Sequence, residues 1–291
     1  MKKPMFLTVV AAFGLLSVMM SVAVRQAQAR GNTTQVLSNT TKDFVPPIVF
    51  QAAGPTISSI QGSIDDFRAA LGAPNNGNAP GPLAIGRREI NWDGGSNNNQ
   101  TTAVAGNPFA GFQVTRGALF TTPDGTGFVQ APAAADPVLF PPGGLAGVFN
   151  NPTYGTVFTA FSPARLFSAI GSNITEVDFF VPGGGNIRAT VAGFGAVFTD
   201  VDQPGASKQG KRGSSSLIEY FGADGELLFT SFIPASPGDG SLSFFGILFE
   251  DARIARVRIT SGKVAPGPDD AAKIDIVMMD DFLYGEPQPL P

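Results

Sequence analysis

The feature that most constrains this fold is the regularity with which glycine and proline interrupt short β-rich runs. The chain has 36 glycines and 24 prolines in 291 residues. From about residue 80 onward, runs rich in Phe, Val, Ile and Thr alternate with Gly, Pro, Asn and Asp clusters, which is typical of short strands joined by turns. The predicted strands lie at residues 112–122, 154–161, 174–181, 187–201, 216–221, 226–233, 241–249, 254–260 and 273–285.

The order of these runs indicates how the strands are arranged. The sequence Gly222-Ala223-Asp224-Gly225 separates two of them and predicts a β-hairpin. Strands do not alternate with long helices, which argues against a parallel sheet. The 25 phenylalanines would supply most of a core between two sheets. We therefore predict an all-β fold, an antiparallel β-sandwich of jelly-roll type with one N-terminal amphipathic helix.

That helix is predicted over residues 56–72 (TISSIQGSIDDFRAALG). Ser58 or Ser59 is the expected N-cap, and Gly72 is expected to end the helix. Apolar side chains recur at helical spacing, at Ile57, Ile60, Ile64, Phe67 and Leu71. The stripe predicts a helix face that packs on a sheet.

The first 29 residues have the order of a secretory signal peptide. Lys2 and Lys3 precede an apolar stretch over 5–24, and Ala27-Gln28-Ala29 resembles a cleavage site. The apolar stretch is nearly long enough to cross a bilayer, so a retained N-terminal anchor is the alternative. We expect a signal peptide at 1–29, a flexible mature N-terminus at 30–47, a single β-sandwich domain at 48–287 and a tail at 288–291. The expected location is secreted or extracellular, with a periplasmic or cell-surface location as alternatives.

Composition excludes several classes of function. The chain contains no cysteine and no histidine, which excludes a Ser-His-Asp triad, a cysteine nucleophile and a zinc or haem site with those ligands. A net charge of −4 gives none of the basic footprint that nucleic acid requires, so nucleic acid is not an expected partner. After signal cleavage no membrane span is expected, and the oligomeric state is left open.

Calcium is the one metal that the composition favours, because its ligands are oxygens. Asp200 and Asp202 follow a predicted strand, and Asp280 and Asp281 lie near the last one. A sandwich can bring such positions together, so these four are the candidate calcium ligands. Aspartates at strand ends also cap turns, and neither segment has the spacing of a recognised calcium loop.

Catalysis by carboxylates needs neither histidine nor cysteine, but the sequence does not favour it. Some carbohydrate-cleaving sandwiches carry Glu-x-Asp-x-x-Glu along one strand. The nearest segment here, residues 273–280, has an aspartate but neither glutamate. Glu89 and Asp93 would lie about 13 Å apart along an extended strand, too far to act as a pair. We predict that the protein is not an enzyme.

The segment GRREINWDGG, residues 86–95, is the densest group of chemically capable side chains and contains the only tryptophan. In an extended strand, Arg88, Ile90 and Trp92 share one face, which predicts a core face with Arg88 near its edge. The opposite face carries Arg87, Glu89, Asn91 and Asp93, which are the candidate ligand-binding residues. A half-buried strand with a solvated polar ladder is the simpler interpretation.

Several strings in order resemble a family of uncharacterised secreted bacterial β-sandwich proteins. They are GRREINWDG, RGALFTTPDGTGF, GFGAVFTDVD, IEYFGADGELL and the closing VMMDDFLYGEP. The resemblance covers most of residues 48–287 and implies export and a single domain, but it implies no activity and no site residue.

These observations predict a secreted, non-catalytic β-sandwich that binds a surface polymer or glycan, with a structural calcium ion as a candidate cofactor. A carboxylate-dependent glycan-cleaving enzyme and a purely structural envelope or matrix protein are the alternatives.

Overall fold

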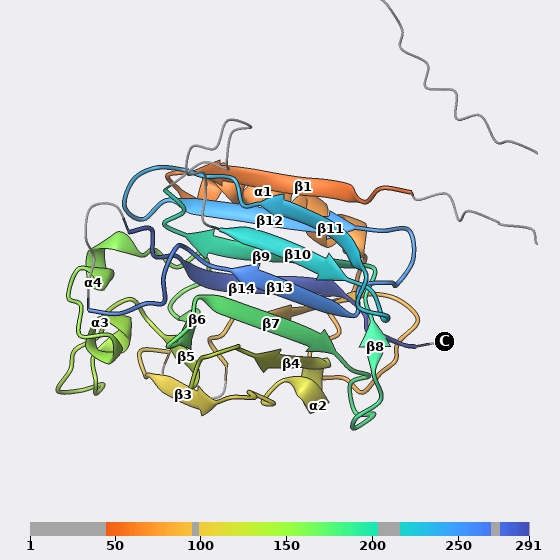
Figure 1. Cartoon of the computed structure of the whole chain (residues 1–291), viewed down its shortest axis with the longest axis horizontal. Coiled ribbons are helices and arrows are strands. Elements are labelled where there is room, and N and C mark those ends of the chain that lie inside the picture. Colours follow the sequence, from red (N-terminus) through yellow and green to blue (C-terminus); the bar gives the residue numbers. More distant parts are fainter. Residues whose placement is uncertain (1–44, 95–98, 203–215, 269–273, 291) are drawn as a thin grey trace, which may run out of the picture. The chain divides into compact units, whose positions relative to one another are not determined.

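Two antiparallel sheets pack face to face in the computed structural model (Figure 1). The structure describes residues 45–94, 99–202, 216–268 and 274–290. The predicted signal peptide and most of the predicted flexible N-terminus lie outside the described residues. The predicted all-β sandwich is confirmed.

The larger sheet, sheet A, has eight strands. Seven of them follow the spatial order β1 (Ile48–Gly54), β12 (Leu242–Leu248), β9 (Gly193–Thr199), β14 (Met278–Gly285), β6 (Leu166–Ile170), β5 (Gly127–Ala131) and β3 (Ala103–Gly106). The eighth strand, β2 (Arg87–Ile90), lies beside β14.

The smaller sheet, sheet B, has the order β11 (Leu227–Phe232), β10 (Leu217–Phe221), β13 (Arg256–Thr260), β7 (Ile174–Phe179) and β4 (Ala118–Thr121). A third pairing joins β15 (Gln288–Pro289) to β8 (Ala189–Thr190). Going along the chain, β9, β10, β12, β13 and β14 alternate between the sheets, with β11 completing a hairpin, as a jelly-roll path does.

The sequence predicted some elements correctly and others wrongly. The hairpin of β10 and β11 is confirmed, with Leu217 opposite Phe232. The predicted strand at 154–161 is wrong, because Tyr154–Val157 form the short helix α4. The predicted strand at 112–122 is correct only over β4, since α2 (Gln113–Arg116) precedes it. A further short helix, α3 (Gly144–Val148), follows β5.

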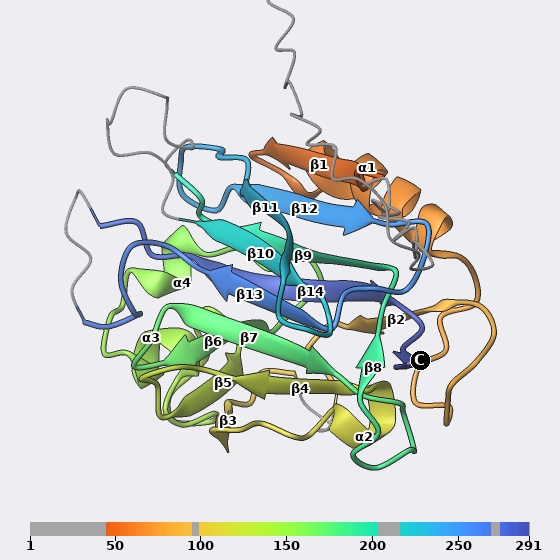
Figure 2. The ribbon, with the colours of Figure 1, turned by 45° about the vertical axis from the view of Figure 1, so that its right-hand side comes forward.

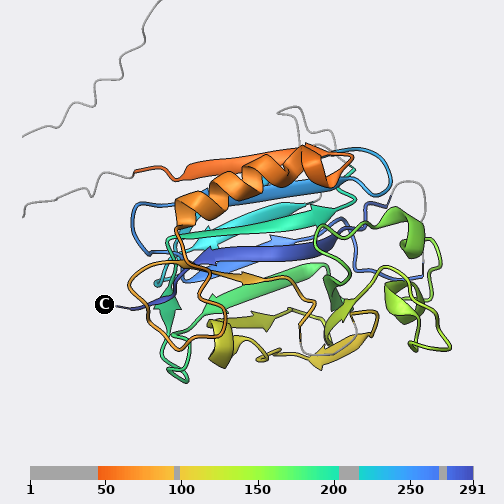
Figure 3. The same ribbon diagram turned by 180° about the vertical axis from the view of Figure 1, so that it is seen from behind.

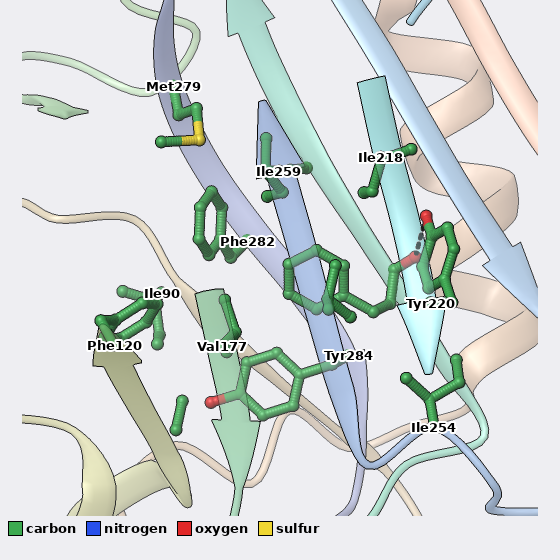
Figure 4. Packing of buried hydrophobic residues seen from close by; sticks show 14 of the residues in the cluster. Ile90, Phe120, Val177, Ile218, Tyr220, Ile254, Ile259, Met279, Phe282 and Tyr284 are labelled. Carbon is green, nitrogen blue, oxygen red and sulfur yellow. Dashed lines mark hydrogen bonds between the residues drawn. The ribbon is translucent and has the colours of Figure 1, made fainter. Parts of the chain in front are cut away.

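The core between the sheets combines aromatic rings with aliphatic side chains (Figure 4). Trp92 stacks on Phe167 with ring centroids 3.7 Å apart, and it meets Phe282 edge-on at 5.1 Å. Figure 4 also shows Tyr220, which lies in this core and donates its hydroxyl proton to the carbonyl of Phe194. A polar tip that finds a main-chain acceptor allows tyrosine to be fully buried.

Helix α1 (Ile57–Leu71) packs on the outer face of sheet A over β1 and β12, as Figure 3 shows from behind. Its buried side is Ile60, Ile64, Phe67 and Leu71, so the prediction that this stripe packs on a sheet is confirmed. Ile57 is 41 % exposed and lies off the packed face. The N-cap is Thr56 rather than Ser58 or Ser59, whereas the predicted end at Gly72 is correct.

This cover explains a contrast in burial between the sheets. In β7 of sheet B, partly exposed and buried residues alternate, as expected for a sheet with one solvated face. In β9 and β14 of sheet A every residue is buried, because the second face of these strands is covered as well. Polar side chains on β14 must therefore find partners within the protein.

Candidate functional site

The GRREINWDGG segment lies beside the last long strand. Strand β2 pairs antiparallel with the end of β14, with Ile90 opposite Phe282 and Arg87 opposite Gly285 (Figure 2). The start of β14 pairs instead with β6, where Met279 lies opposite Phe167. On this side of β14 the paired strand therefore changes from β6 to β2 between Met279 and Phe282.

A β-bulge occupies the point of change. Met279 pairs with Phe198 of β9 and Phe282 pairs with Ala196, so Asp280 and Asp281 together oppose a single residue of β9. The bulge breaks the usual alternation, and both carboxylates reach the same neighbour, the hydroxyl of Ser162. Asp280 is fully buried and Asp281 is 3 % exposed.

Asp280 holds the chain segment between α4 and β6. Its Oδ2 accepts the main-chain N–H groups of Phe161 at 2.6 Å and Ser162 at 3.3 Å. Its Oδ1 lies 3.3 Å from Ser162 Oγ. The main-chain carbonyl of Asp280 accepts the indole N–H of Trp92 at 2.9 Å, which ties the bulge to the segment after β2.

Asp281 is linked to helix α1 and to β2. Its Oδ1 accepts the Ser162 hydroxyl at 2.6 Å, and its Oδ2 lies 3.4 Å from a guanidinium nitrogen of Arg68. The same guanidinium donates to Glu89 at 2.9 Å. Glu89 also accepts from Arg87 Nε at 2.7 Å. One arginine of the helix thus bridges a carboxylate of each of the two paired strands.

Asp93 completes the group from the turn after β2. Its Oδ1 accepts the main-chain N–H groups of Ala164 at 2.8 Å and Arg165 at 2.9 Å. Its Oδ2 lies 3.5 Å from Ser162 Oγ. We call Arg68, Glu89, Asp93, Ser162, Asp280 and Asp281 the Ser162 cluster.

Burial dominates the electrostatics of the cluster. It raises the pKa of Asp280 well above its ordinary value, and the charge of Asp281 raises that pKa further. Burial also raises the pKa of Asp281, although hydrogen bonds from Ser162 and Asp280 and the charge of Arg68 oppose the shift. Burial would lower the pKa of Arg68, but its hydrogen bond and attraction to Glu89 outweigh this effect and raise it.

The four predicted ligand-binding residues lie in or beside this cluster. Glu89 and Asp93 are members of it, Arg87 contacts Glu89, and Asn91 is exposed. The strand ends at Ile90, and Trp92 has a left-handed backbone with φ 64°. The extended conformation predicted through Asp93 is therefore wrong, although Ile90 and Trp92 both face the core as predicted.

The predicted calcium ligands have two separate sets of partners. Asp280 and Asp281 belong to the Ser162 cluster. Asp202 instead accepts the N–H of Gly238 at 2.8 Å, and its own N–H donates to Asp275. Asp200 has φ 70° and donates its N–H to the carbonyl of Ser241. Within the described ranges, no group of three or more Asp, Glu, His or Cys side chains could hold a metal ion. Calcium binding stays a prediction, without a ligand set in the structure.

A second ion pair was missed by the sequence prediction. Arg88 was expected near the edge of the core face, but it is fully buried and forms a two-pronged pair with Glu286, at 2.8 and 2.7 Å. Its remaining N–H groups donate to the carbonyls of Gly77, Ala79 and Thr115. Glu286 also accepts from Asn76 and from the main chain of Leu83. No local pattern links these positions, because their contact depends on the pairing of β2 with β14.

A surface cavity of about 440 Å³ lies next to the same strand pair. It is lined by apolar and glycine residues from the end of α1 and the segment before β2, including Leu71, Gly72, Ile85 and Gly86. Glu286 and Gln288 contribute polar atoms to its wall. Arg87 donates to the carbonyl of Gly72 at 3.1 Å, so this side chain lies between the cavity and the Ser162 cluster.

The fold and this site define an all-β protein, a two-sheet sandwich with a buried carboxylate cluster on its central strand. No family model, curated protein or solved structure matches the chain in the comparisons. The resemblance to secreted sandwich proteins accordingly stays a prediction. No helix among the described residues is long and apolar enough to cross a membrane.

Proposed function

We propose that this protein is a non-catalytic β-sandwich module that binds an extracellular polymer or glycan on the outer surface of sheet A. The observation that carries the proposal is the polar rim beside the cavity at the β2–β14 pair. The rim consists of Arg68, Arg87 and Glu89, which are joined by ion pairs, and of the exposed Asn91 that follows β2. The predicted signal peptide supports an extracellular partner.

The side chains of the rim are accessible to solvent and are held in fixed orientations. The side chains of Arg68, Arg87 and Glu89 are 23, 17 and 13 % exposed, and each is held by another charged group. Asn91 is exposed on the same segment. Guanidinium, carboxylate and amide groups together offer donors and acceptors to hydroxyl-rich chains, and their ion pairs reduce the entropy lost on binding.

The neighbouring cavity supplies the apolar part of such a site. Ile85 lines it and is 69 % exposed, and Leu71 forms part of its wall. Ligand sites commonly combine an apolar hollow with a few fixed polar groups. The glycines in the wall leave main-chain atoms accessible to a ligand, because they lack side chains.

Binding can be tested on a polysaccharide array with the chain that follows the predicted signal peptide, one rim variant and one variant of the cavity wall. Asn91→Ala and Ile85→Ala remove exposed side chains, so the fold should be unaffected. We expect each to weaken binding by about tenfold, which corresponds to about 1.4 kcal/mol. Val138→Ala is the matched control, because Val138 is 85 % exposed and does not line the cavity. No binding by the wild type to any polymer, or equal binding by all variants, would contradict the proposal.

A carboxylate-dependent glycan-cleaving enzyme is the second candidate. It is supported by the raised pKa of Asp280 beside other carboxylates, since perturbed pKa values concentrate at functional sites. It requires that substrate reaches a pair of carboxyls, whereas Asp280 is fully buried and Asp281 is 3 % exposed. Release of reducing ends from a bound polymer, lost in Asp281→Asn, would favour the enzyme over the binding module.

A further inference from the structure

A second cavity adjoins the one beside the β2–β14 pair. It also measures about 440 Å³, and Leu71, Ala192 and Leu248 line both cavities. The rest of its wall comes from the segment that leads into β1, from the end of α1 and from the segment after β12. These wall residues are Val45, Pro46, Ile48, Ala70, Phe249 and Glu250. Because all but one of them are apolar, a ligand that fills both cavities meets a long, mostly apolar surface.

The ionisable side chains in the described walls of the two cavities are both glutamates. Glu286 lines the first cavity, and Arg88 already holds its two carboxylate oxygens at 2.7 and 2.8 Å. Glu250 lines the second cavity and is exposed. In the described part of the chain, Glu250 has no hydrogen-bond or ion-pair partner. The free charge of the walls is therefore negative.

A second free carboxylate lies close to the same cavity. Asp66 is exposed on α1 and lies one helical turn before Ala70, which lines the second cavity. Residues four positions apart on a helix are neighbours on one face. Among the described residues Asp66, like Glu250, has no hydrogen-bond or ion-pair partner. Two carboxylates without a counter-charge thus lie at an apolar hollow.

The cations described around the cavities are already paired with carboxylates. Arg68 and Arg87 of the rim both pair with Glu89. Arg253 lies over the ring of a wall residue of the second cavity, and it pairs with Asp251. An anionic ligand would have to displace one of these carboxylates, whereas a cationic ligand meets two carboxylates that are free. The net charge of −4 attracts a cationic ligand over a longer range as well.

We propose that the two cavities bind an amine-bearing glycan, a polymer of amino sugars whose nitrogen atoms are unacetylated and protonated. This assignment rests on the proposed binding function and adds the chemistry of its ligand. The faces of the sugar rings cover the apolar walls, and the ammonium groups lie at Glu250 and Asp66. The hydroxyl groups meet Asn91 and the paired side chains of the rim, which favours a glycan over a lysine-bearing peptide.

The test compares two oligosaccharides of equal length, glucosamine oligomers and their fully N-acetylated forms. Both have the same sugar backbone, so they differ in the acetyl groups and the charge. Isothermal titration calorimetry measures their binding to the protein used for the array. We expect the wild type to bind the amine form about tenfold more tightly at low salt. The preference should shrink as added salt screens the charges.

Variants of the two carboxylates show whether they cause the preference. Glu250→Gln and Asp66→Asn should each reduce it by about threefold, as expected for exposed ion pairs, and the double variant should abolish it. Both side chains are exposed, so the fold should be unaffected. Asp224→Asn is the matched control, because Asp224 is an exposed aspartate in the turn of the β10–β11 hairpin, and it should keep the full preference.

The outcomes separate this assignment from the proposed function. Equal or tighter binding of the N-acetylated oligomers, still weakened by Ile85→Ala, would overturn the amine-bearing class and leave the binding module standing. A preference that survives in the double variant would also overturn it. Polylysine that binds as tightly as the amine oligomers, with no loss in Ile85→Ala, would overturn it by showing attraction to charge alone. Binding of no polymer and no oligomer would contradict both proposals.

Discussion

At the scale of single residues, the pair of Arg88 and Glu286 is the most consequential polar contact. Both side chains are buried, and Arg88 makes five hydrogen bonds. Removing one partner leaves the other charged and buried, which typically costs about 3–5 kcal/mol. We expect Arg88→Met and Glu286→Leu each to lower the free energy of unfolding by about that amount.

The double variant tests whether the pair acts as a unit. Because the second substitution removes a charge that the first has left unpaired, the loss in Arg88→Met/Glu286→Leu should be close to that of one single variant. Denaturant unfolding followed by the fluorescence of Trp92, the only tryptophan, measures all four proteins. Losses that simply add would show that the two side chains stabilise the fold independently.

The burial of single residues was predicted correctly where apolar side chains face the core. Ile90 and Trp92 were predicted to face the core and do so. Arg88 lies on the same face, but an arginine is seldom buried without a carboxylate partner. That partner, Glu286, lies far away in the sequence. The local pattern around Arg88 contains no such partner, so it predicted that Arg88 lies at the edge of the core face.

At the scale of elements, α1 is seated in a notch of sheet A. Gly195 of β9 lies opposite Gly246 of β12, and a Cβ added at Gly195 would lie 2.9 Å from Phe67 Cε1. Phe67 also packs against the rings of Phe50 and Phe244. The two glycines thus leave room for one aromatic side chain of the helix.

Filling the notch should weaken the docking of the helix. We expect Gly195→Ala to lower the free energy of unfolding by about 1–3 kcal/mol, because overpacking forces the neighbours to shift. The penalty should be smaller in a Phe67→Leu background, which removes the ring that clashes. Gly106→Ala is the control, since a Cβ at Gly106 on β3 meets nothing within 4 Å. An equal penalty with and without Phe67 would show that the notch does not seat the ring.

The elements that were missed or predicted wrongly have two physical causes. Strands β5 (GFVQA) and β6 (LFSAI) are buried at all but one residue each, so neither shows an alternation of apolar and polar residues. In the segment at 154–161 the aromatic residues Tyr154, Phe158 and Phe161 recur at intervals of four and three, which is helical spacing. The prediction of a strand relied on the high β-propensity of these aromatic residues, whereas their helical spacing was the correct signal.

At the scale of the whole molecule, the candidate site was predictable only as two separate fragments. The sequence identified Glu89 with Asp93, and Asp280 with Asp281, but assigned them to different sites. Two features of the tertiary structure unite them: the pairing of β2 with β14, and the bulge that breaks the alternation of Asp280 and Asp281. Neither Ser162 nor Arg68 had a local signal, since each matters only through groups far along the chain.

The same long-range pairing predicts where the chain can be shortened. Truncation after Pro287 removes β15 and the hydrogen bond from Gln288 to the carbonyl of Leu83, but it keeps Glu286. We expect this protein to unfold cooperatively with a small loss of stability. Truncation after Gly285 also removes the partner of Arg88 and the acceptor of Asn76 and Leu83. It should cost at least about 3 kcal/mol more.

Comparing the two truncations by denaturant unfolding isolates Glu286, because they differ by this residue and Pro287 alone. The control restores the carboxylate alone. A protein that ends at Glu286 should recover most of the lost stability. The Glu286→Gln variant of the same length should not recover it. Equal stability of the proteins that end at Gly285 and Pro287 would mean that Arg88 is satisfied by the carbonyls of Gly77, Ala79 and Thr115 alone. The closure of the fold would then depend on the β2–β14 ladder itself.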